Sequence, residues 1–213
     1  DTFTARLPAA LQWLPPGDSY AWLGETGSGQ AIVRRDPVSG EETVLPLTGI
    51  PGLPADFRVS DFQWHPGSGF LLLKGPASTD WQGYESALWY VYHVAEERLR
   101  LLGEPGQALQ LVKLSPDGRR AGFVFANNLL VVDLASGERR PVTRDGSEDI
   151  FNGIFDYGST EFGWVDGWRW SPDSERLTFW RMDATAVPHY PPIAELHSYS
   201  RVRDFHYPNT GER

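Results

Sequence analysis

The chain contains no cysteine among its 213 residues, and this absence removes two kinds of stabilising chemistry. No disulfide can form, and no thiolate can hold a metal ion. Lysine is also nearly absent, with only Lys74 and Lys113. The formal net charge of −9 argues against nucleic acid as a partner, because such a partner calls for a basic stripe on the protein.

Long hydrophobic runs are missing as well. No apolar segment approaches the roughly 18 to 20 residues that a membrane-spanning helix needs, and we find no signal peptide at the start. We therefore expect a soluble chain without a membrane span, of unknown compartment, either bacterial-type periplasmic or cytoplasmic. Helical periodicity is equally scarce: residues 96–102 come nearest to a 3.6-residue apolar spacing, but they stand where an outer β-strand is expected.

The chain does have a repeated turn. Each copy ends an apolar run with a large side chain, fixes one φ angle with proline and opens the next run with Gly, Asp or Ser. The four copies are WLPPGD at 13–18, WHPG at 64–67, LSPDG at 114–118 and WSPD at 170–173. They recur at intervals of about 51, 50 and 56 residues. A period of about 40 to 50 residues is typical of four-stranded propeller blades.

The third repeat shows the strand pattern most clearly. It has four short runs, at 109–114, 120–126, 129–134 and 140–143, with turns at Asn127-Asn128 and at 135–138. The second repeat follows the same plan, with central strands at 70–74 and 86–94. We therefore predict an all-β chain of antiparallel four-stranded blades, about four in number, with bounds near 7–55, 56–106, 107–147 and 148–213.

An aromatic, glycine-flanked run at 149–163 interrupts the fourth repeat. It places the carboxylate of Glu161 among Phe155, Tyr157, Phe162 and Trp164. Insertions in repeat proteins often collect on the binding face, which makes Glu161 the candidate functional residue. The alternative is a solvated glutamate that caps a short helix.

Catalytic and metal-binding side chains are harder to find. The nearest match to a nucleophile elbow, the GDSYA run around Ser19, lacks the final glycine and the strand–turn–helix context, so we exclude a catalytic Ser19. His189, His197 and His206 lie in an irregular tail, with no i, i+4 pair and no acidic residue at metal-ligand spacing. His65 lies in a turn and His93 near a strand end, and we interpret all five histidines as surface or turn residues. We predict no catalytic residue, no metal and no cofactor in this chain.

The fourth repeat resembles a known family. It contains EDIFNGIFDY at 148–157, then Glu161, then WRWSPD at 168–173. This series is similar to a stretch of the dipeptidyl peptidase IV family, whose pattern is roughly EDIxNGIxDW, an acidic motif and WWSP[DN]G. FWRMD at 179–183 and the YPNTG element at 207–211 also look like family sequence, and DWQGY at 80–84 resembles the family's QWRHSY loop. The resemblance covers the whole chain at the level of blades and is specific from about residue 109 onward.

This resemblance implies a serine exopeptidase with an eight-bladed N-terminal propeller and a C-terminal α/β-hydrolase domain. The catalytic triad of such enzymes lies in the hydrolase domain, which is absent from this chain, so the chain would supply half of the propeller and have that domain as its partner. Family members release dipeptides, or in some relatives tripeptides, after proline or alanine. The resemblance thus implies a peptide substrate with a free N-terminus.

Glu161 suits the recognition of that N-terminus. An α-amine with a pKa of about 7.7 to 8.0 is largely protonated at neutral pH, and a carboxylate in a dry pocket pairs strongly with it. Because an extended peptide advances about 3.3 to 3.6 Å per residue, the anchor also measures how many residues are released. The single glutamate of TEFG at 160–163 resembles the prolyl tripeptidyl peptidase branch, whereas dipeptide-releasing members have two adjacent glutamates.

Three further hypotheses concern Gln82, the function of the chain and its assembly. Gln82 stands where the family loop has a substrate-binding arginine, and it could donate an amide N–H to substrate or be an ordinary loop residue. The chain could instead be a non-catalytic propeller-type module that binds a peptide or protein. An open half-propeller would expose sheet edges, so we expect a homodimer or aggregation of the isolated chain.

Overall fold

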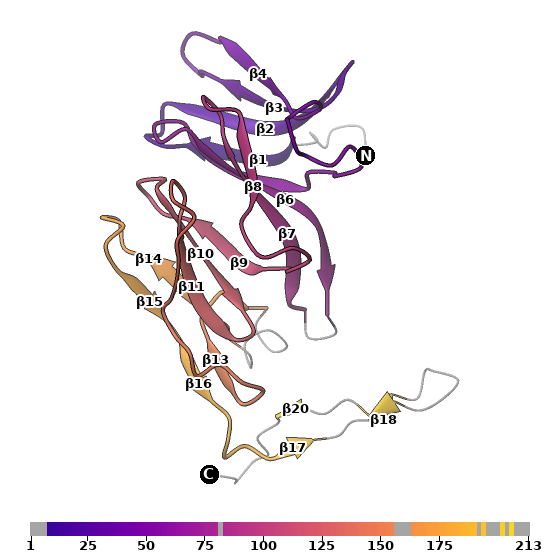
Figure 1. Ribbon diagram of the computed structural model, residues 1–213, viewed down its shortest axis with the longest axis vertical. Helices are drawn as coiled ribbons and strands as arrows, with labels where there is room; N and C mark the ends of the chain where they lie inside the picture. The colour runs from indigo at the N-terminus through magenta and orange to yellow at the C-terminus, as the bar shows by residue number, and fades with distance from the viewer. Residues whose placement is uncertain are drawn as a thin grey trace, which may run out of the picture.

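The computed structural model describes residues 8–80, 83–155, 163–190, 193–194, 201–202 and 205–206. Every regular element in these ranges is a β-strand, which confirms the all-β prediction (Figure 1). Within the same ranges, the structure contains no helix of the length and apolarity that a membrane crossing requires.

Three four-stranded antiparallel sheets follow one another, each with its strands in sequence order. The first contains β1 (Ala9–Leu14), β2 (Ser19–Thr26), β3 (Gly29–Arg35) and β4 (Glu42–Pro46). The second contains β5 (Asp61–His65), β6 (Phe70–Thr79), β7 (Glu85–His93) and β8 (Arg98–Leu101). The third contains β9 (Gln110–Leu114), β10 (Arg120–Phe125), β11 (Asn128–Asp133) and β12 (Arg139–Pro141).

The fourth repeat differs from the first three because the insertion divides it. Its strands form two pairs, β13 (Ile150–Asn152) with β16 (Arg181–Asp183) and β14 (Trp168–Trp170) with β15 (Leu177–Phe179). Farther along the chain, β17 (His189–Tyr190) pairs with β20 (Phe205–His206), and β18 (Ile193–Ala194) pairs with β19 (Arg201–Val202). In Figure 1, β17 and β20 lie beyond β13 and β16, at the C-terminal end of the array.

The repeated turn has the same place in every repeat, between β1 and β2, β5 and β6, β9 and β10, and β14 and β15. In the third repeat the Ser115 hydroxyl donates to Asp117 at 2.6 Å and accepts from the N–H of Arg120 at 2.9 Å. In the fourth repeat Ser171 donates to Asp173 at 2.5 Å. The motif predicts these turns correctly because its short polar side chains satisfy local groups that the strands leave unpaired.

One predicted turn is wrong by a single residue. The sequence places the turn after β10 at Asn127-Asn128, but Asn128 pairs with Phe125, and Ala126 and Asn127 form the turn with φ of 47° and 56°. Positive φ at both central positions gives a type I′ turn, whose twist matches that of the flanking strands. Asn128 stays in the strand, and its side-chain oxygen accepts from the N–H of Gly146 at 2.9 Å.

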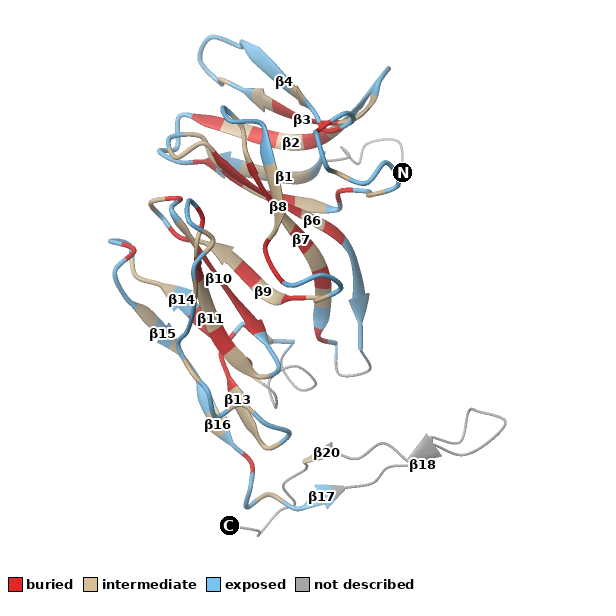
Figure 2. Ribbon diagram, in the orientation of Figure 1, coloured by how far each residue is buried: buried red, intermediate tan, exposed pale blue. Residues whose placement is uncertain are grey.

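The hydrophobic core lies between successive sheets, and β6 shows why. Phe70, Leu71, Leu72 and Leu73 are consecutive and all buried. Leu71 and Leu73 belong to the cluster shared with the first sheet, whereas Phe70 and Leu72 belong to the cluster shared with the third. Because neighbouring side chains of a strand point to opposite faces, a sheet covered on both faces needs a continuous apolar run. Figure 2 shows the buried residues gathered along the middle strands.

Side-chain hydrogen bonds join the first strands of successive sheets. Gln12 on β1 donates to the carbonyl of Phe62 on β5 at 2.7 Å. Gln63 on β5 donates to the carbonyl of Val112 at 2.7 Å and accepts from the N–H of Leu114 at 2.6 Å, both on β9. These bonds hold β1, β5 and β9 side by side, and we call this row of strands the inner edge.

Candidate substrate pocket

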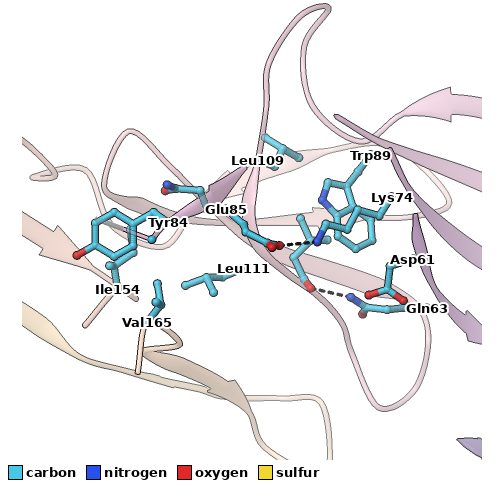
Figure 3. Close-up of a pocket in the computed structure, with 13 residues that line it drawn as sticks. Asp61, Gln63, Lys74, Tyr84, Glu85, Trp89, Leu109, Leu111, Ile154 and Val165 are labelled. Carbon is cyan, nitrogen blue, oxygen red and sulfur yellow. Dashed lines mark hydrogen bonds and ion pairs between the residues drawn. The ribbon is translucent and has the colours of Figure 1, made fainter. Parts of the chain in front are cut away.

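A pocket of about 370 Å³, the inner pocket, opens where the second, third and fourth repeats meet at the inner edge (Figure 3). Its walls come from β5, from β6 and β7 with the loop between them, from the start of the third sheet, and from both ends of the insertion. The lining residues are Asp61, Gln63, Lys74, Gly83, Tyr84, Glu85, Trp89, Leu109, Gln110, Leu111, Val112, Ile154 and Val165.

The described ends of the insertion are paired as two short antiparallel segments. Ile154 and Asp166 form a β-bridge, and the N–H of Phe155 donates to the carbonyl of Val165 at 3.1 Å. We call these four residues the insertion stem. The stem fixes where the chain leaves the fourth repeat and where it returns.

Two glycines, Gly153 and Gly167, allow the two backbone segments of the stem to approach each other closely at its base. The N–H of Gly167 donates to the carbonyl of Gly153 at 3.2 Å. A Cβ on Gly167 would lie 2.9 Å from the carbonyl carbon of Gly153, and Gly153 itself has φ of +77°. Any side chain at these positions would therefore push the two segments apart or strain the backbone.

A buried cluster holds the stem against the loop between β6 and β7. Tyr84, at the end of that loop, packs with Ile154 of the stem and with Trp168 of β14, together with Val124 and Leu129 of the third sheet. The loop and the stem therefore rest on one surface and face the same pocket.

The four residues predicted to contact substrate all lie outside the described residues: Gln82, Tyr157, Glu161 and Phe162. Their described neighbours in the chain are nevertheless placed. Gly83, next to Gln82, lines the inner pocket, and so do Ile154 and Val165, which flank the run that contains the other three. The fold thus brings Gly83, Ile154 and Val165 to one pocket, whereas Phe155 and Gly163, which directly adjoin the run that contains Glu161, line a second cavity.

The two described aromatic residues of the wall expected around Glu161, Phe155 and Trp164, do not line the inner pocket. Phe155 and Trp164 line a second cavity of about 500 Å³ with Trp180, and the Phe155 and Trp180 rings have centroids 5.6 Å apart. Ile154, the neighbour of Phe155, lines the inner pocket instead. The reason is the alternation of a β-strand, which sends consecutive side chains to opposite faces.

The two lysines of the chain lie beside the inner pocket and the insertion stem, Lys74 on β6 and Lys113 on β9. Lys74 Nζ is 2.8 Å from Glu85 Oε2 in the wall of the inner pocket. Lys113 forms an ion pair with Asp166 of the stem, donates to the carbonyl of Trp168 at 2.6 Å and lies 4.2 Å from the centroid of that ring. Burial lowers the pKa of Lys113 to about 8, although the Asp166 carboxylate opposes this shift.

The lining can bind a ligand that has both polar and apolar parts. Asp61, Gln63 and Glu85 offer carboxylate and amide groups, whereas Leu111 and Ile154 offer an apolar wall. A concave site with a few placed polar groups on apolar walls is the usual form of a small-ligand or peptide site.

Ser19, which the sequence excludes as a nucleophile, is buried at the start of β2. Its hydroxyl donates to the Asp18 carboxylate and accepts from Arg34, each at 3.1 Å. His65 and His93 are turn residues, as interpreted from the sequence, because each accepts from a backbone N–H three residues further on, at 3.0 and 3.2 Å.

The interpretation of two other histidines changes with the structure. Spacing in the sequence offers no acidic partner to His189 or His206, but the fold brings Asp149 to both. Asp149 Oδ1 lies 2.9 Å from His206 Nε2 and 3.7 Å from His189 Nε2. The pairing of β17 with β20 brings the two histidines together beside Asp149, and no local sequence pattern predicts such a long-range contact. His197 lies outside the described residues.

Known proteins resemble the chain over nearly its whole length. Residues 65–213 match the family model described as the dipeptidyl peptidase IV (DPP IV) N-terminal region. The chain is 29% identical to dipeptidyl-aminopeptidase B of Aspergillus niger, over 94% of this chain and 26% of that protein. A probable dipeptidyl-aminopeptidase B of Penicillium rubens is 28% identical over 95% of this chain and 25% of its own length.

A solved structure shows the same fold. The crystal structure of Porphyromonas gingivalis dipeptidyl peptidase 4 matches 96% of this chain and 29% of its own, with a TM-score of 0.79 and 26% identity. The chain spans about a quarter of the length of the two curated relatives, 26% of the first and 25% of the second.

Proposed function

The chain belongs to the dipeptidyl peptidase IV family as its N-terminal region, and from this premise we propose that it is the substrate-anchoring part of a serine exopeptidase. In this proposal the enzyme releases dipeptides or tripeptides after proline or alanine. The catalytic triad belongs to a hydrolase domain outside this chain, and this chain binds the substrate's N-terminus.

The observation that carries the proposal is the inner pocket. Its lining includes Gly83 and Tyr84 from one predicted contact loop and Ile154 and Val165 from the other. Because both segments reach one concave, partly apolar surface, a single extended peptide could contact both loops at once.

We assign the anchor role to Glu161. Its carboxylate would pair with the substrate ammonium, and Tyr157 and Phe162 would exclude water and so strengthen the charge-assisted bond. Gln82 would donate an amide N–H to a substrate carbonyl, without the charge and fork that arginine brings. The length of the released peptide then follows from the distance between Glu161 and the serine of the hydrolase domain.

Full-length enzyme carrying Glu161→Gln tests this assignment. The substrates are a dipeptide and a tripeptide that end in proline before a chromophore, each with a free and an acetylated N-terminus. We expect kcat/KM on the preferred free substrate to fall by a factor that corresponds to about 2 to 5 kcal/mol of lost transition-state stabilisation, because the buried ammonium loses its charged partner. The control is Glu175→Gln, a side chain that is 70% exposed in the fourth repeat.

The two substrates also decide between dipeptide and tripeptide release. The single glutamate at 161 favours release of a tripeptide, whereas the curated relatives are named dipeptidyl-aminopeptidases. Equal kcat/KM for wild type and Glu161→Gln on both free substrates would remove the anchor role.

The alternative function is a propeller that binds a peptide or protein without cleaving it. Two observations of the full-length protein distinguish the alternatives, namely turnover of the substrates and calorimetric binding of uncleaved peptide. Binding without turnover would favour the binding module. The homodimer and the compartment stay predictions from the sequence.

A further inference from the structure

We propose that Asp149, His189 and His206 form a binding site for a divalent transition-metal ion, with Zn²⁺ as the best match. Each residue offers one ligand atom, and these atoms all lie within 4.8 Å of one another. Two imidazole nitrogens and a carboxylate oxygen are a donor set that Zn²⁺ accepts readily. The proposal does not depend on the peptidase function.

The spacing of the ligand atoms fits tetrahedral zinc. With metal–ligand distances of about 2.0 to 2.1 Å, two ligands of a tetrahedral ion lie about 3.3 to 3.4 Å apart. The distances from Asp149 Oδ1 to His206 Nε2 and His189 Nε2, 2.9 and 3.7 Å, lie on either side of this value. The ligand nitrogens of His189 and His206 lie within 4.8 Å of each other, so a movement of the half-exposed His189 side chain would complete the tetrahedral spacing.

The hydrogen bonds of His206 identify which nitrogen is available. Its Nδ1 lies 2.9 Å from the carbonyl oxygen of Val187, which can only accept, so Nδ1 carries a proton. In the neutral ring, Nε2 then presents a lone pair to the Asp149 carboxylate at 2.9 Å. Two lone pairs at this distance repel unless a proton or a metal ion lies between them. A ring N–H bound to a backbone carbonyl is also the usual support of a metal-binding histidine.

His189 favours the metal over the proton. It lies directly opposite His206 in the β17–β20 pair, and the two rings have centroids 4.1 Å apart. Two imidazolium rings at this separation would repel each other and compete for one carboxylate. One divalent ion, in contrast, binds both neutral rings and the carboxylate together.

The position of the site gives the ion a structural role. Asp149 directly precedes β13, and its carbonyl accepts from the N–H of Ala184 just after β16 at 2.8 Å. His189 and His206 belong to β17 and β20. The ion would therefore tie the β17–β20 pair to the fourth repeat. His206 is 8% exposed, whereas His189 is 46% exposed, so the ion can enter from solvent, and water can take the fourth position.

The test uses tag-free full-length protein stripped of metal with a chelator and titrated with ZnCl₂ by calorimetry. We expect one more zinc per chain in wild type than in His189→Ala or Asp149→Asn, or affinity at least about tenfold weaker in those variants. His189 is exposed and the Asp149 change is isosteric, so both variants should fold, as circular dichroism can verify. His93→Gln and Glu175→Gln, outside the site, should bind like wild type.

A second measurement does not depend on the variants. Zinc is expected to raise the Tm of wild type, and Co²⁺ is expected to give the intense visible absorption of a four-coordinate site. Zinc stoichiometry and affinity that are equal in wild type and both ligand variants would overturn the proposal. Absence of zinc binding and of any Tm shift in wild type would overturn it too, and would identify the His206–Asp149 contact as a proton-mediated ion pair.

Discussion

Tyr84 and Ile154, which belong to the second and the fourth repeats, are buried in one hydrophobic cluster and line the same pocket. Tyr84 ends the loop between β6 and β7, and Ile154 belongs to the insertion stem. This contact links the two loops that the sequence identifies as candidate substrate contacts, so their relative position depends on core packing between repeats.

Tyr84→Ala is expected to loosen the insertion stem. Losing an aromatic side chain from a packed cluster costs about 3 to 5 kcal/mol, and part of that loss should fall on the adjoining stem. Amide hydrogen exchange at Phe155 and Gly167, whose N–H groups donate within or beside the stem, should become roughly tenfold faster or more. Tyr84→Phe, which keeps the ring, is the control. Unchanged exchange in Tyr84→Ala would show that the stem holds its position without the tyrosine.

Gly122→Ala is expected to destabilise the fold through Trp168. A Cβ at this position would lie 2.5 Å from the Trp168 ring in a packed cluster, and such overpacking costs about 1 to 3 kcal/mol. A smaller ring in Trp168→Phe should relieve the clash, so the double variant should be more stable than the sum of the single effects by at least about 0.5 kcal/mol. Urea unfolding measures the free energies of unfolding of the two single variants and the double variant.

The control for this cycle is Gly24→Ala on β2. A Cβ there would lie 3.4 Å from the nearest side-chain atom, an ordinary contact, and we expect a change within about 0.5 kcal/mol. If the changes in free energy of unfolding caused by Gly122→Ala and Trp168→Phe add exactly in the double variant, the predicted clash between the two residues is contradicted.

Lys113 makes stability depend on pH in the alkaline range. Burial lowers its pKa from 10.5 in the unfolded chain to about 8 in the fold, so between these values the unfolded state binds more protons. The free energy of unfolding of wild type, relative to Lys113→Met, should be constant below about pH 8 and rise from there to about 10.5. Urea titrations of both proteins across this range measure the difference. A fall instead of a rise would mean that the ion pair with Asp166 outweighs burial.

The 213-residue chain by itself is expected to associate, because aromatic side chains are exposed at both ends of the array. Trp13 in the first sheet is 65% exposed and Trp180 in the fourth repeat is 62% exposed. Exposed apolar surface of this kind drives association. Light scattering should show dimers or larger species, and Trp13→Ser with Trp180→Ser should reduce them. Val38→Ser, in an exposed turn, is the control, and a monomeric wild-type chain would contradict the prediction.

The sequence predicts the strands and turns well because these depend on neighbours in the chain. Proline, serine and aspartate in the repeated turn satisfy groups within a few residues, as Ser115 and Asp117 do. The continuous apolar run of β6 likewise indicates a strand buried on both faces. The one-residue error at Asn127-Asn128 has a local cause, since the φ angles of Ala126 and Asn127 decide the turn.

The sequence by itself determined the all-β repeat and the place of the insertion, because both depend on local composition and spacing, and it indicated the family through the resemblance of motifs such as EDIFNGIFDY at 148–157. Only the tertiary structure decided which distant residues contact the insertion and its surroundings. Tyr84 reaches Ile154, Lys113 reaches Asp166, and Asp149 reaches the two histidines through packing between repeats. Such contacts join residues whose separation follows no fixed period, so no pattern along the chain can encode them.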